Sequence, residues 1–295
     1  MIKFDFDSMV NSFIDKDNFN KLMMKKTDVY DKFNSAYMTG WTKKISEEEV
    51  EKIINVSKEV KKHSKCLVVI GIGGSFLGSY AVKEMFGSYF NNKQFPIIYA
   101  GTTLSSKYME ELLEYLRGVD FSVNVISKSG TTMETTITYQ MIKSLMEEKY
   151  SLEEMKKRII VTTDKEKGKL RQEVNECGYI SFEIPDDVGG RYSIMTAAHL
   201  FPLAFNIDIE KFIDGYYKGE NYREDAFNYA IVRKCLADSG KYVENYCVYE
   251  EKLYYFTEWL KQLFGESEGK DGKGIFPVST VHTSCLLYTS PSPRD

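Results

Sequence analysis

The sequence has 295 residues, of which 43% are hydrophobic and 28% charged, a composition typical of a globular chain with one large or two ordinary domains. Its 39 basic and 43 acidic side chains give a net charge of −4. The chain therefore lacks the basic surplus typical of proteins that bind nucleic acids or anionic membranes. The five cysteines and three histidines lack the spacing of disulfides or of a metal site, so we expect reduced thiols and no metal cofactor. The sequence contains no signal-peptide core and no apolar run of membrane-spanning length, so we expect a soluble cytoplasmic protein.

Residues 1–45 mix aromatic residues with Asp, Lys and Asn, and we expect them to form an N-terminal helical arm. A longer helix is predicted over residues 46–63. Ser46 and Glu49 have the spacing of a capping box, and apolar residues recur behind them at helical intervals. This apolar stripe predicts packing against a core rather than a functional site.

From Cys66 onward, short apolar runs alternate with segments of helix length, the pattern of a parallel sheet with crossover helices. The five predicted strands are residues 67–70, 96–100, 122–126, 158–162 and 179–184. They predict an α/β domain over residues 46–205, built on a doubly wound parallel five-stranded sheet. In such sheets ligands bind at the carboxyl ends of the strands, so the following loops are the candidate sites.

The first of these loops, residues 71–78, reads GIGGSFLG and leads from a strand into a helix. It departs from the dinucleotide-binding fingerprint because Phe76 stands where the third glycine belongs, and the second strand ends without the acidic residue that would hold a ribose. The loop is therefore interpreted as a close-approach surface for a sugar or phosphate, with Gly74 and Ser75 nearest the ligand. A purely structural glycine turn is the alternative.

The second loop follows the third strand and reads SKSGTT over residues 127–132. Its hydroxyl donors are Ser127, Ser129, Thr131 and Thr132. Gly130 permits unusual backbone angles, Lys128 adds a positive charge, and a helix begins directly afterwards, so the segment has the features of a phosphate cradle. The alternative is an ordinary Ser/Thr-rich turn whose hydroxyls cap the helix.

The third loop, residues 187–193, places Arg191 after two glycines at the same edge of the sheet. A guanidinium beside bare backbone suits an oxyanion or an enolate oxygen better than a lysine would. The alternative is an arginine that forms a surface salt bridge.

After residue 205 the alternation resumes, with a helix at 225–237, a strand at 242–249, a helix at 251–264 and a strand at 274–278. We expect residues 206–284 to begin a second α/β domain that is truncated. Residues 285–295 break the pattern with two prolines among small polar residues, and we interpret them as a non-native tail from translated adapter or out-of-frame DNA.

The last motif, residues 261–270, reads KQLFGESEGK and places carboxylates at the end of the predicted helix. A carboxylate in this position becomes a general base when burial raises its pKa towards neutrality. The spacing does not choose between Glu266 and Glu268, and a solvated charged loop is the alternative.

Four motifs together resemble the bacterial glucose-6-phosphate isomerase (phosphoglucose isomerase) family, in the same order and over about residues 60–284. They are residues 71–78, 127–135, 189–193 and 262–270. The resemblance implies two three-layer sugar-isomerase (SIS) domains and an active site between them in a homodimer. It further implies interconversion of glucose 6-phosphate and fructose 6-phosphate through an enediol(ate), in glycolysis and gluconeogenesis and without any cofactor.

Residue roles follow from the same resemblance. Ser127, Ser129 and Thr132 match the family's phosphate-binding hydroxyls, and Gly74 and Ser75 match its sugar-contacting loop. Arg191 matches the arginine that stabilises the enediolate, Glu266 the base that moves a proton between C1 and C2, and Gln262 a neighbouring substrate contact. The resemblance thus selects Glu266 over Glu268.

The family pattern continues with an Asp-Leu-His-Ser sequence, whose His assists ring opening, and with a Lys near the C-terminus; neither position exists here. His282 lies upstream of that His and does not take its role. We therefore expect a truncated isomerase. The alternatives are a non-catalytic sugar-phosphate-binding SIS module, which needs the cradle but no base, and a nicotinamide dehydrogenase, which the missing acidic residue argues against.

Overall fold

The computed structural model describes residues 3–90 and 93–282. The chain separates into two compact units, each described here by itself. One unit comprises residues 37–214, and the other combines the residues up to Ala36 with those from Gly215 onward. The predicted tail at 285–295 lies outside the described residues.

The unit of residues 37–214 is built on a five-stranded sheet with the order β2-β1-β3-β4-β5. All four neighbouring pairs are parallel. The strands are β1 (Cys66–Ile70), β2 (Ile97–Ala100), β3 (Phe121–Ile126), β4 (Ile159–Thr163) and β5 (Ile180–Glu183). The central strands β1, β3 and β4 are buried along their whole length, as expected for apolar strands covered on both faces. The doubly wound parallel sheet is thus confirmed.

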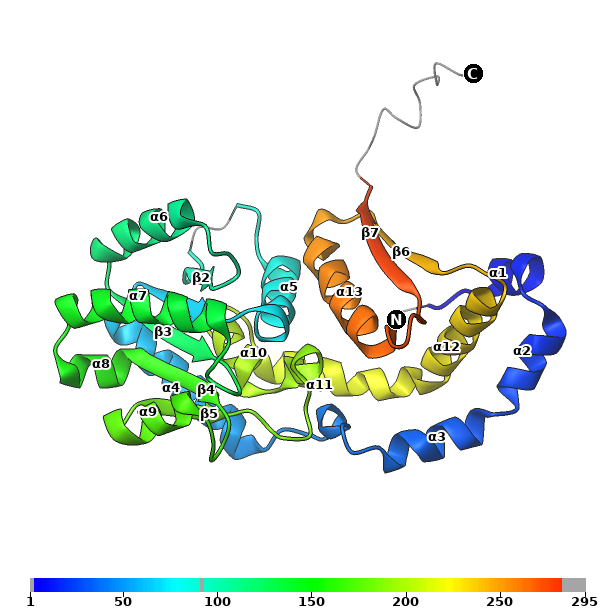
Figure 1. Ribbon diagram of the computed structural model, residues 1–295, viewed down its shortest axis with the longest axis horizontal. Coiled ribbons are helices and arrows are strands. Elements are labelled where there is room, and N and C mark those ends of the chain that lie inside the picture. Colours follow the sequence, from blue (N-terminus) through cyan, green and yellow to red (C-terminus); the bar gives the residue numbers. More distant parts are fainter. Residues whose placement is uncertain (1–2, 91–92, 283–295) are drawn as a thin grey trace, which may run out of the picture. The chain divides into compact units, whose positions relative to one another are not determined.

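Helices surround this sheet in a three-layer arrangement (Figure 1). They are α4 (Glu47–His63), α5 (Leu77–Phe86), α6 (Ser106–Arg117), α7 (Met133–Lys149), α8 (Leu152–Arg158), α9 (Lys169–Cys177), α10 (Ala197–Leu203) and α11 (Ile209–Tyr217), the last of which crosses the boundary between the units. Helices α6, α7, α8 and α9 share one apolar core with alternate residues of the strands. Helices α4, α5 and α10 pack together, and Phe201 of α10 contacts Phe182 of β5 with a ring-centre distance of 5.1 Å.

The order of the strands fixes where ligand-binding loops meet. Because β1 lies beside both β2 and β3, the chain reverses its direction of winding between β1 and β3. The loops that follow these two strands therefore emerge side by side at the carboxyl edge of the sheet, where open α/β sheets bind their ligands. They contain residues 71–76 and 127–132, the first two motifs of the sequence.

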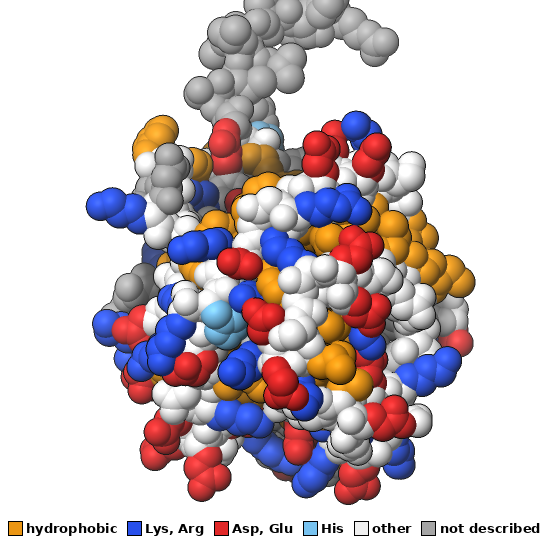
Figure 2. All heavy atoms as spheres, turned by 90° about the vertical axis from the view of Figure 1, so that its left-hand side faces the viewer, with side chains coloured by type: hydrophobic (Ala, Val, Ile, Leu, Met, Phe, Trp, Pro, Cys, Tyr) orange, Lys and Arg blue, Asp and Glu red, His pale blue; other side chains and the backbone are white. Residues whose placement is uncertain are grey.

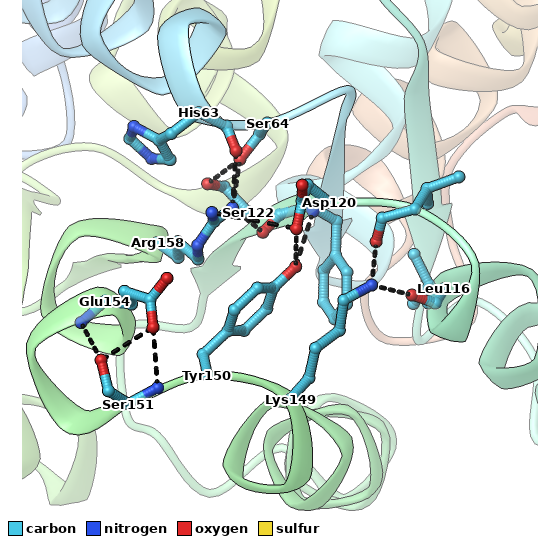
Figure 3. Close-up of polar contacts among 12 residues, drawn as sticks. His63, Ser64, Leu116, Asp120, Ser122, Lys149, Tyr150, Ser151, Glu154 and Arg158 are labelled. Carbon is cyan, nitrogen blue, oxygen red and sulfur yellow. Dashed lines mark hydrogen bonds and ion pairs between the residues drawn. The ribbon is translucent and has the colours of Figure 1, made fainter.

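The opposite, amino edge of the sheet is closed by a network of polar contacts (Figure 3). The buried Arg158 donates to the carbonyl oxygen of His63 at 2.8 Å and to Ser64 Oγ at 3.1 Å, and Ser64 Oγ lies 2.7 Å from Ser122 Oγ. The guanidinium also stacks 4.2 Å from the centre of the Tyr150 ring. The network joins the starts of β1, β3 and β4.

We expect Tyr150→Phe to destabilise the unit of residues 37–214 by about 1–3 kcal/mol, the range for leaving a buried donor without a partner. The Tyr150 hydroxyl accepts the buried Phe121 N–H at 3.0 Å and donates to Asp120 Oδ1 at 3.3 Å, so its removal leaves that N–H unsatisfied. The measurement is urea unfolding followed by tryptophan fluorescence. Tyr115→Phe, at a tyrosine that is 47% exposed, is the control, and equal losses for both variants would contradict the role of the network.

The second unit contains helices from both ends of the chain. Its elements are α1 (Asp7–Phe13), α2 (Lys16–Met23), α3 (Lys26–Ser35), α12 (Arg223–Asp238), β6 (Val243–Val248), α13 (Tyr254–Glu268) and β7 (Phe276–Val281). Ile14 of the N-terminal arm joins Phe227, Ile231 and Val232 of α12 in a small apolar core. The N-terminal residues form α1, α2 and α3, and α1 and α2 pack on α12.

Strands β6 and β7 pair in parallel, and α13 connects them. This β-α-β unit is the building block of a doubly wound sheet. The helix predicted at 251–264 is α13, which starts later, at Tyr254, and ends later, at Glu268. Gly265 lies inside this helix, and Gly269 caps its end by donating its N–H to the Gly265 carbonyl. Among the residues that the structure describes, no helix combines the length and apolarity needed to cross a membrane.

Candidate functional site

The hydroxyl-rich loop after β3 folds back on itself through its own side chains. Ser127 is 4% exposed, its Oγ accepts the Gly130 N–H at 3.1 Å, and it lies 3.4 Å from Thr132 Oγ1. Ser129 Oγ accepts from the Thr131 N–H at 3.2 Å and from its hydroxyl at 2.9 Å. Gly130 has a φ of +69°, which explains the need for glycine in this turn. The loop thus gathers several hydroxyls within one short turn.

Helix α7 starts without a side-chain cap. Thr132 occupies the N-cap position but makes no side-chain capping bond there. The first N–H groups of a helix have no partner inside the helix, and the helix dipole adds a partial positive charge beside them. The Thr132 hydroxyl lies near Ser127 Oγ instead of capping the helix.

Lys128 points out of the loop. Its Nζ lies 3.4 Å from the carbonyl oxygens of Pro185 and Asp186, and 3.1 Å from Asp186 Oδ1. The charge of Lys128 is therefore shared with a carboxylate, whereas the Ser127 and Ser129 hydroxyls bond to groups of their own loop. Direct contact between Lys128 and a phosphate would require it to leave Asp186.

The glycine loop after β1 is pressed against the turn that carries Arg191. A Cβ added to Gly74 would lie 2.4 Å from the carbonyl carbon of Gly190 and 2.8 Å from the Arg191 nitrogen, so only glycine fits there. The loop forms the 3₁₀ helix η2 (Gly73–Ser75), and the turn forms η3 (Gly190–Met195). The Arg191 guanidinium carbon lies 5.1 Å from the centre of the Tyr192 ring. The structure thus brings the segments of Gly74, Ser75 and Arg191 together at one edge of the sheet.

A buried histidine that the motifs did not single out holds these two segments together. His199 of α10 is 1% exposed, and its Nε2 lies 2.7 Å from the Gly74 carbonyl oxygen and 3.0 Å from Ser193 Oγ. Its Nδ1 accepts the Ser79 N–H at 2.9 Å. A single His inside the apolar run of residues 197–205 has no spacing signal, so no sequence pattern selects it.

Lowering the pH should reduce the unfolding free energy of the unit of residues 37–214, because His199 is difficult to protonate in the folded state. Burial, opposed by the hydrogen bond to Gly74, lowers the pKa of His199 from 6.5 to about 4. Between these values the unfolded chain takes up a proton that the folded chain does not, so stability falls as the pH drops. We expect a loss of about 2 kcal/mol between pH 7 and pH 5.

The measurement is urea unfolding at several pH values, followed by the fluorescence of Trp41 in a Trp259→Phe background. The control is His199→Gln, which cannot titrate and should lose less stability over the same interval. An equal loss in both proteins would contradict the assignment of this pH dependence to His199.

Helix α13 carries the remaining predicted residues, and it separates the two candidate bases. Gln262 Nε2 donates to Glu266 Oε1 at 2.9 Å, and Glu266 is exposed. Glu268, by contrast, forms a two-bonded pair with the buried Arg233, at 2.5 Å and 3.0 Å. Arg233 also donates to Glu244 at 2.8 Å. Glu268 is therefore a structural ion-pair residue, and its two oxygens are already used.

The predicted site residues fall into two groups, each within one unit. The first group lies at the carboxyl edge of the five-stranded sheet and comprises Gly74, Ser75, Ser127, Lys128, Ser129, Thr132 and Arg191. The second consists of Gln262 and Glu266, one turn apart on α13. The first group contains hydroxyls of the kind that bind a phosphate and a guanidinium of the kind that stabilises an oxyanion, and the second contains a carboxylate of the kind that transfers a proton.

Comparison with known proteins gives a consistent result. The family model of phosphoglucose isomerase matches residues 47–291. The chain is 50% identical over 249 residues to the glucose-6-phosphate isomerases of Staphylococcus saprophyticus and Staphylococcus epidermidis, and 49% identical to that of Staphylococcus aureus strain Newman. Each match covers 81% of this chain and 56% of the relative, so the chain spans about half the length of the curated relatives it matches.

Solved structures share the fold. A hypothetical protein from Thermus thermophilus superimposes with a TM-score of 0.72 at 25% identity, covering 93% of this chain and 65% of that chain. A glucose-6-phosphate isomerase from Chlamydia trachomatis superimposes with a TM-score of 0.65 at 20% identity, covering 86% of this chain and 54% of that chain. At this identity the second match is evidence for the architecture alone.

Proposed function

The chain belongs to the phosphoglucose isomerase family, and from this premise we propose that it provides a substrate site for the interconversion of glucose 6-phosphate and fructose 6-phosphate. The observation that carries the proposal is the meeting of two loops at the β1/β3 switch point. One loop gathers hydroxyls before a helix start, and the other presses Gly74 against the Arg191 turn. A sugar phosphate needs both a grip for its ester and a cation near its carbonyl.

The loop after β3 is proposed to bind the phosphate. Ser127, Ser129 and Thr132 would supply hydroxyl donors, and the first amides of α7 would supply a favourable dipole. Lys128 is kept as a phosphate-binding residue, with the condition that it exchanges Asp186 for the ligand. Binding of the phosphate orients carbons C1 and C2, which are remote from it, and so contributes to the rate through positioning.

The glycine loop and the Arg191 turn are proposed to bind the reacting end of the sugar. Gly74 and Ser75 are proposed to contact its hydroxyl groups through the backbone of the loop that packs against this turn. Negative charge develops on the carbonyl oxygen as a proton leaves the adjacent carbon, and Arg191 carries a permanent charge with several donors to stabilise that oxygen.

Glu266 is proposed as the base. In the forward direction its carboxylate removes the proton from C2 of the aldose, and the electron pair of that C–H bond forms the enediolate, with the charge on O1. The C2 hydroxyl then gives up its proton while O1 takes one up, and the proton held by Glu266 returns to C1 to give the ketose. No net oxidation occurs, so this chemistry requires no redox partner. The pairing of Glu268 with Arg233 supports the choice of Glu266, because Glu268 could act only by breaking two bonds to a buried guanidinium. Gln262 would hold the Glu266 carboxylate.

Further properties are proposed from family membership: a SIS domain over residues 46–205 with a second beginning at 206, a cytoplasmic homodimer, and a role in glycolysis and gluconeogenesis. The β-α-β unit of β6, α13 and β7 supports the second domain. Figure 2 shows basic and acidic side chains interspersed over one face, and the described residues of this face form no extended basic patch of the kind that nucleic acids require.

The test is deuterium incorporation at C2 of glucose 6-phosphate in heavy water, with binding measured separately by calorimetry, in a version of the protein that spans the full length of its relatives. Binding together with exchange is expected. Binding without exchange would replace the isomerase by a non-catalytic sugar-phosphate-binding module, and the absence of both would contradict the proposal altogether.

A further inference from the structure

His199 connects three segments around the proposed sugar site. Its Nε2 contacts the Gly74 carbonyl oxygen at 2.7 Å and the Ser193 hydroxyl at 3.0 Å, so one ring edge contacts both η2 and η3. Its other nitrogen contacts the Ser79 N–H of α5 at 2.9 Å. The side chain is buried, and therefore it cannot act on the substrate itself.

These contacts fix the tautomer of the ring. A backbone N–H can only donate, so Nδ1 must accept from Ser79, and the ring proton of neutral His199 is then on Nε2. A carbonyl oxygen can only accept, so Nε2–H donates to Gly74. Ser193 Oγ lies 2.6 Å from the Gly190 carbonyl oxygen, to which it donates. Every polar atom of the imidazole is therefore used, and each contact has one direction.

We propose that His199 is a positioning residue that locks the Gly74–Ser75 backbone onto the turn that carries Arg191. The spacing of these two segments leaves no room for adjustment, since a Cβ on Gly74 would already overlap the Gly190 backbone. A ring that fixes the Gly74 carbonyl also fixes the direction of the following peptide groups, which the sugar would contact. The functional part of this inference depends on the proposed sugar-phosphate site, whereas the mechanical part does not.

A histidine that merely fills and satisfies the core is the competing explanation. The two explanations differ in which ring nitrogen matters. The polar atoms of an Asn side chain lie close to the position of the His199 Nδ1 atom, whereas those of the longer Gln side chain reach the position of the His199 Nε2 atom. His199→Asn should thus keep a partner for Ser79 and lose the Gly74 contact, while His199→Gln should keep the Gly74 contact. A core-filling role predicts that both variants behave alike.

The experiment compares these variants in the full chain by native-state hydrogen exchange. The reporters are the bonded amides of Ser75, Phe76 and Tyr192, which lie on both sides of the contact. In His199→Asn we expect their exchange to accelerate about 10-fold or more, with His199→Gln close to wild type, because only the Asn variant releases the loop. The Phe121 amide, at the far edge of the sheet, is the internal control and should not change.

Ligand binding supplies the second readout, followed by the fluorescence of Trp41, which stacks on Tyr192 at 5.7 Å. In His199→Asn the affinity for fructose 6-phosphate should fall about 10-fold, whereas the affinity for inorganic phosphate should stay within about 2-fold. His199→Gln should restore both affinities. Equal exchange in the two variants, or parallel loss of both ligands, would overturn the inference.

Failure of the proposed function and failure of the positioning role give different results. If the version that spans the full length of the relatives binds no fructose 6-phosphate, the proposed function fails, and the positioning role is then decided by hydrogen exchange alone. If His199→Asn does not fold, Gly78→Ala combined with Ile194→Val replaces it, because a Cβ on residue 78 would lie 3.0 Å from Ile194 Cδ1, which valine lacks, and 3.1 Å from His199 Cε1, so the ring has to shift. This variant should accelerate the same three amides, and unchanged exchange would contradict the proposal.

Discussion

Replacing Glu266 by Gln should remove isomerisation almost completely and leave sugar-phosphate binding intact. The amide keeps the size and hydrogen-bonding capacity of the carboxylate but cannot take up a proton from carbon. General base catalysis contributes about 10²–10⁴-fold, so we expect kcat to fall by about 10³-fold or more with a dissociation constant within about 3-fold of wild type. The measurement is C2 deuterium exchange together with calorimetry, in a protein that spans the full length of the relatives.

Glu268→Gln is the matched control, two residues away on the same helix. It removes a carboxylate that two hydrogen bonds join to the buried Arg233, and so it should lower stability rather than impair the chemistry. We expect loss of a few kcal/mol in unfolding free energy and, in the molecules that remain folded, exchange within about 3-fold of wild type. If Glu268→Gln stopped the exchange and Glu266→Gln did not, the assignment of the base would be wrong.

Gly74→Ala should be the most damaging single-methyl substitution at the sheet edge. Its Cβ would lie 2.4 Å from the Gly190 carbonyl carbon and 2.8 Å from the Arg191 nitrogen, and backbone atoms on both sides cannot rotate away. The two loops must separate, and Arg191 moves with its turn. We expect kcat/KM to fall about 100-fold, as for a displacement of about 1 Å in a catalytic group, and unfolding free energy to fall by about 1–3 kcal/mol.

Gly190→Ala provides the control from the other side of the same contact. The Cβ of this variant would meet the nearest atom, Gly74 Cα, at 3.6 Å, an ordinary van der Waals distance. Its kcat/KM should stay within about 10-fold of wild type, because the two loops keep their spacing. Steady-state kinetics and thermal unfolding of the two variants compare them directly, and similar losses in both would refute the steric argument.

Much of the fold could be predicted because burial dominates its sequence pattern. Runs such as Cys66–Ile70 are apolar throughout, and strands covered on both faces need this composition. The loops after β1 and β3 could be selected because ligands bind at the carboxyl ends of parallel strands, whereas the order of the strands came from the structure. The N-cap role of Ser46, whose Oγ accepts the Glu49 N–H at 3.2 Å, was also a local signal.

Other features depend on contacts that a linear pattern does not contain. Glu268 differs from Glu266 because it pairs with Arg233 of α12, which lies 35 residues away in sequence. The true end of α13 depended on Gly269 rather than the earlier Gly265. His199 acts through Gly74, which lies 125 residues before it, and nothing in the neighbouring sequence indicates that pairing.

The polar contacts around Arg158 lie at the amino edge of the sheet, and the candidate ligand-binding loops lie at its carboxyl edge. At the amino edge the polar side chains bond to one another and to neighbouring backbone carbonyls, whereas at the carboxyl edge the hydroxyl of the buried Ser127 bonds within its own loop and Ser129 is exposed. Natural variation should therefore sort into two classes. We expect changes near the buried Arg158 to lower stability and leave ligand preference unchanged, and changes at the exposed Ser129 of the proposed phosphate loop to alter ligand preference at little cost in stability.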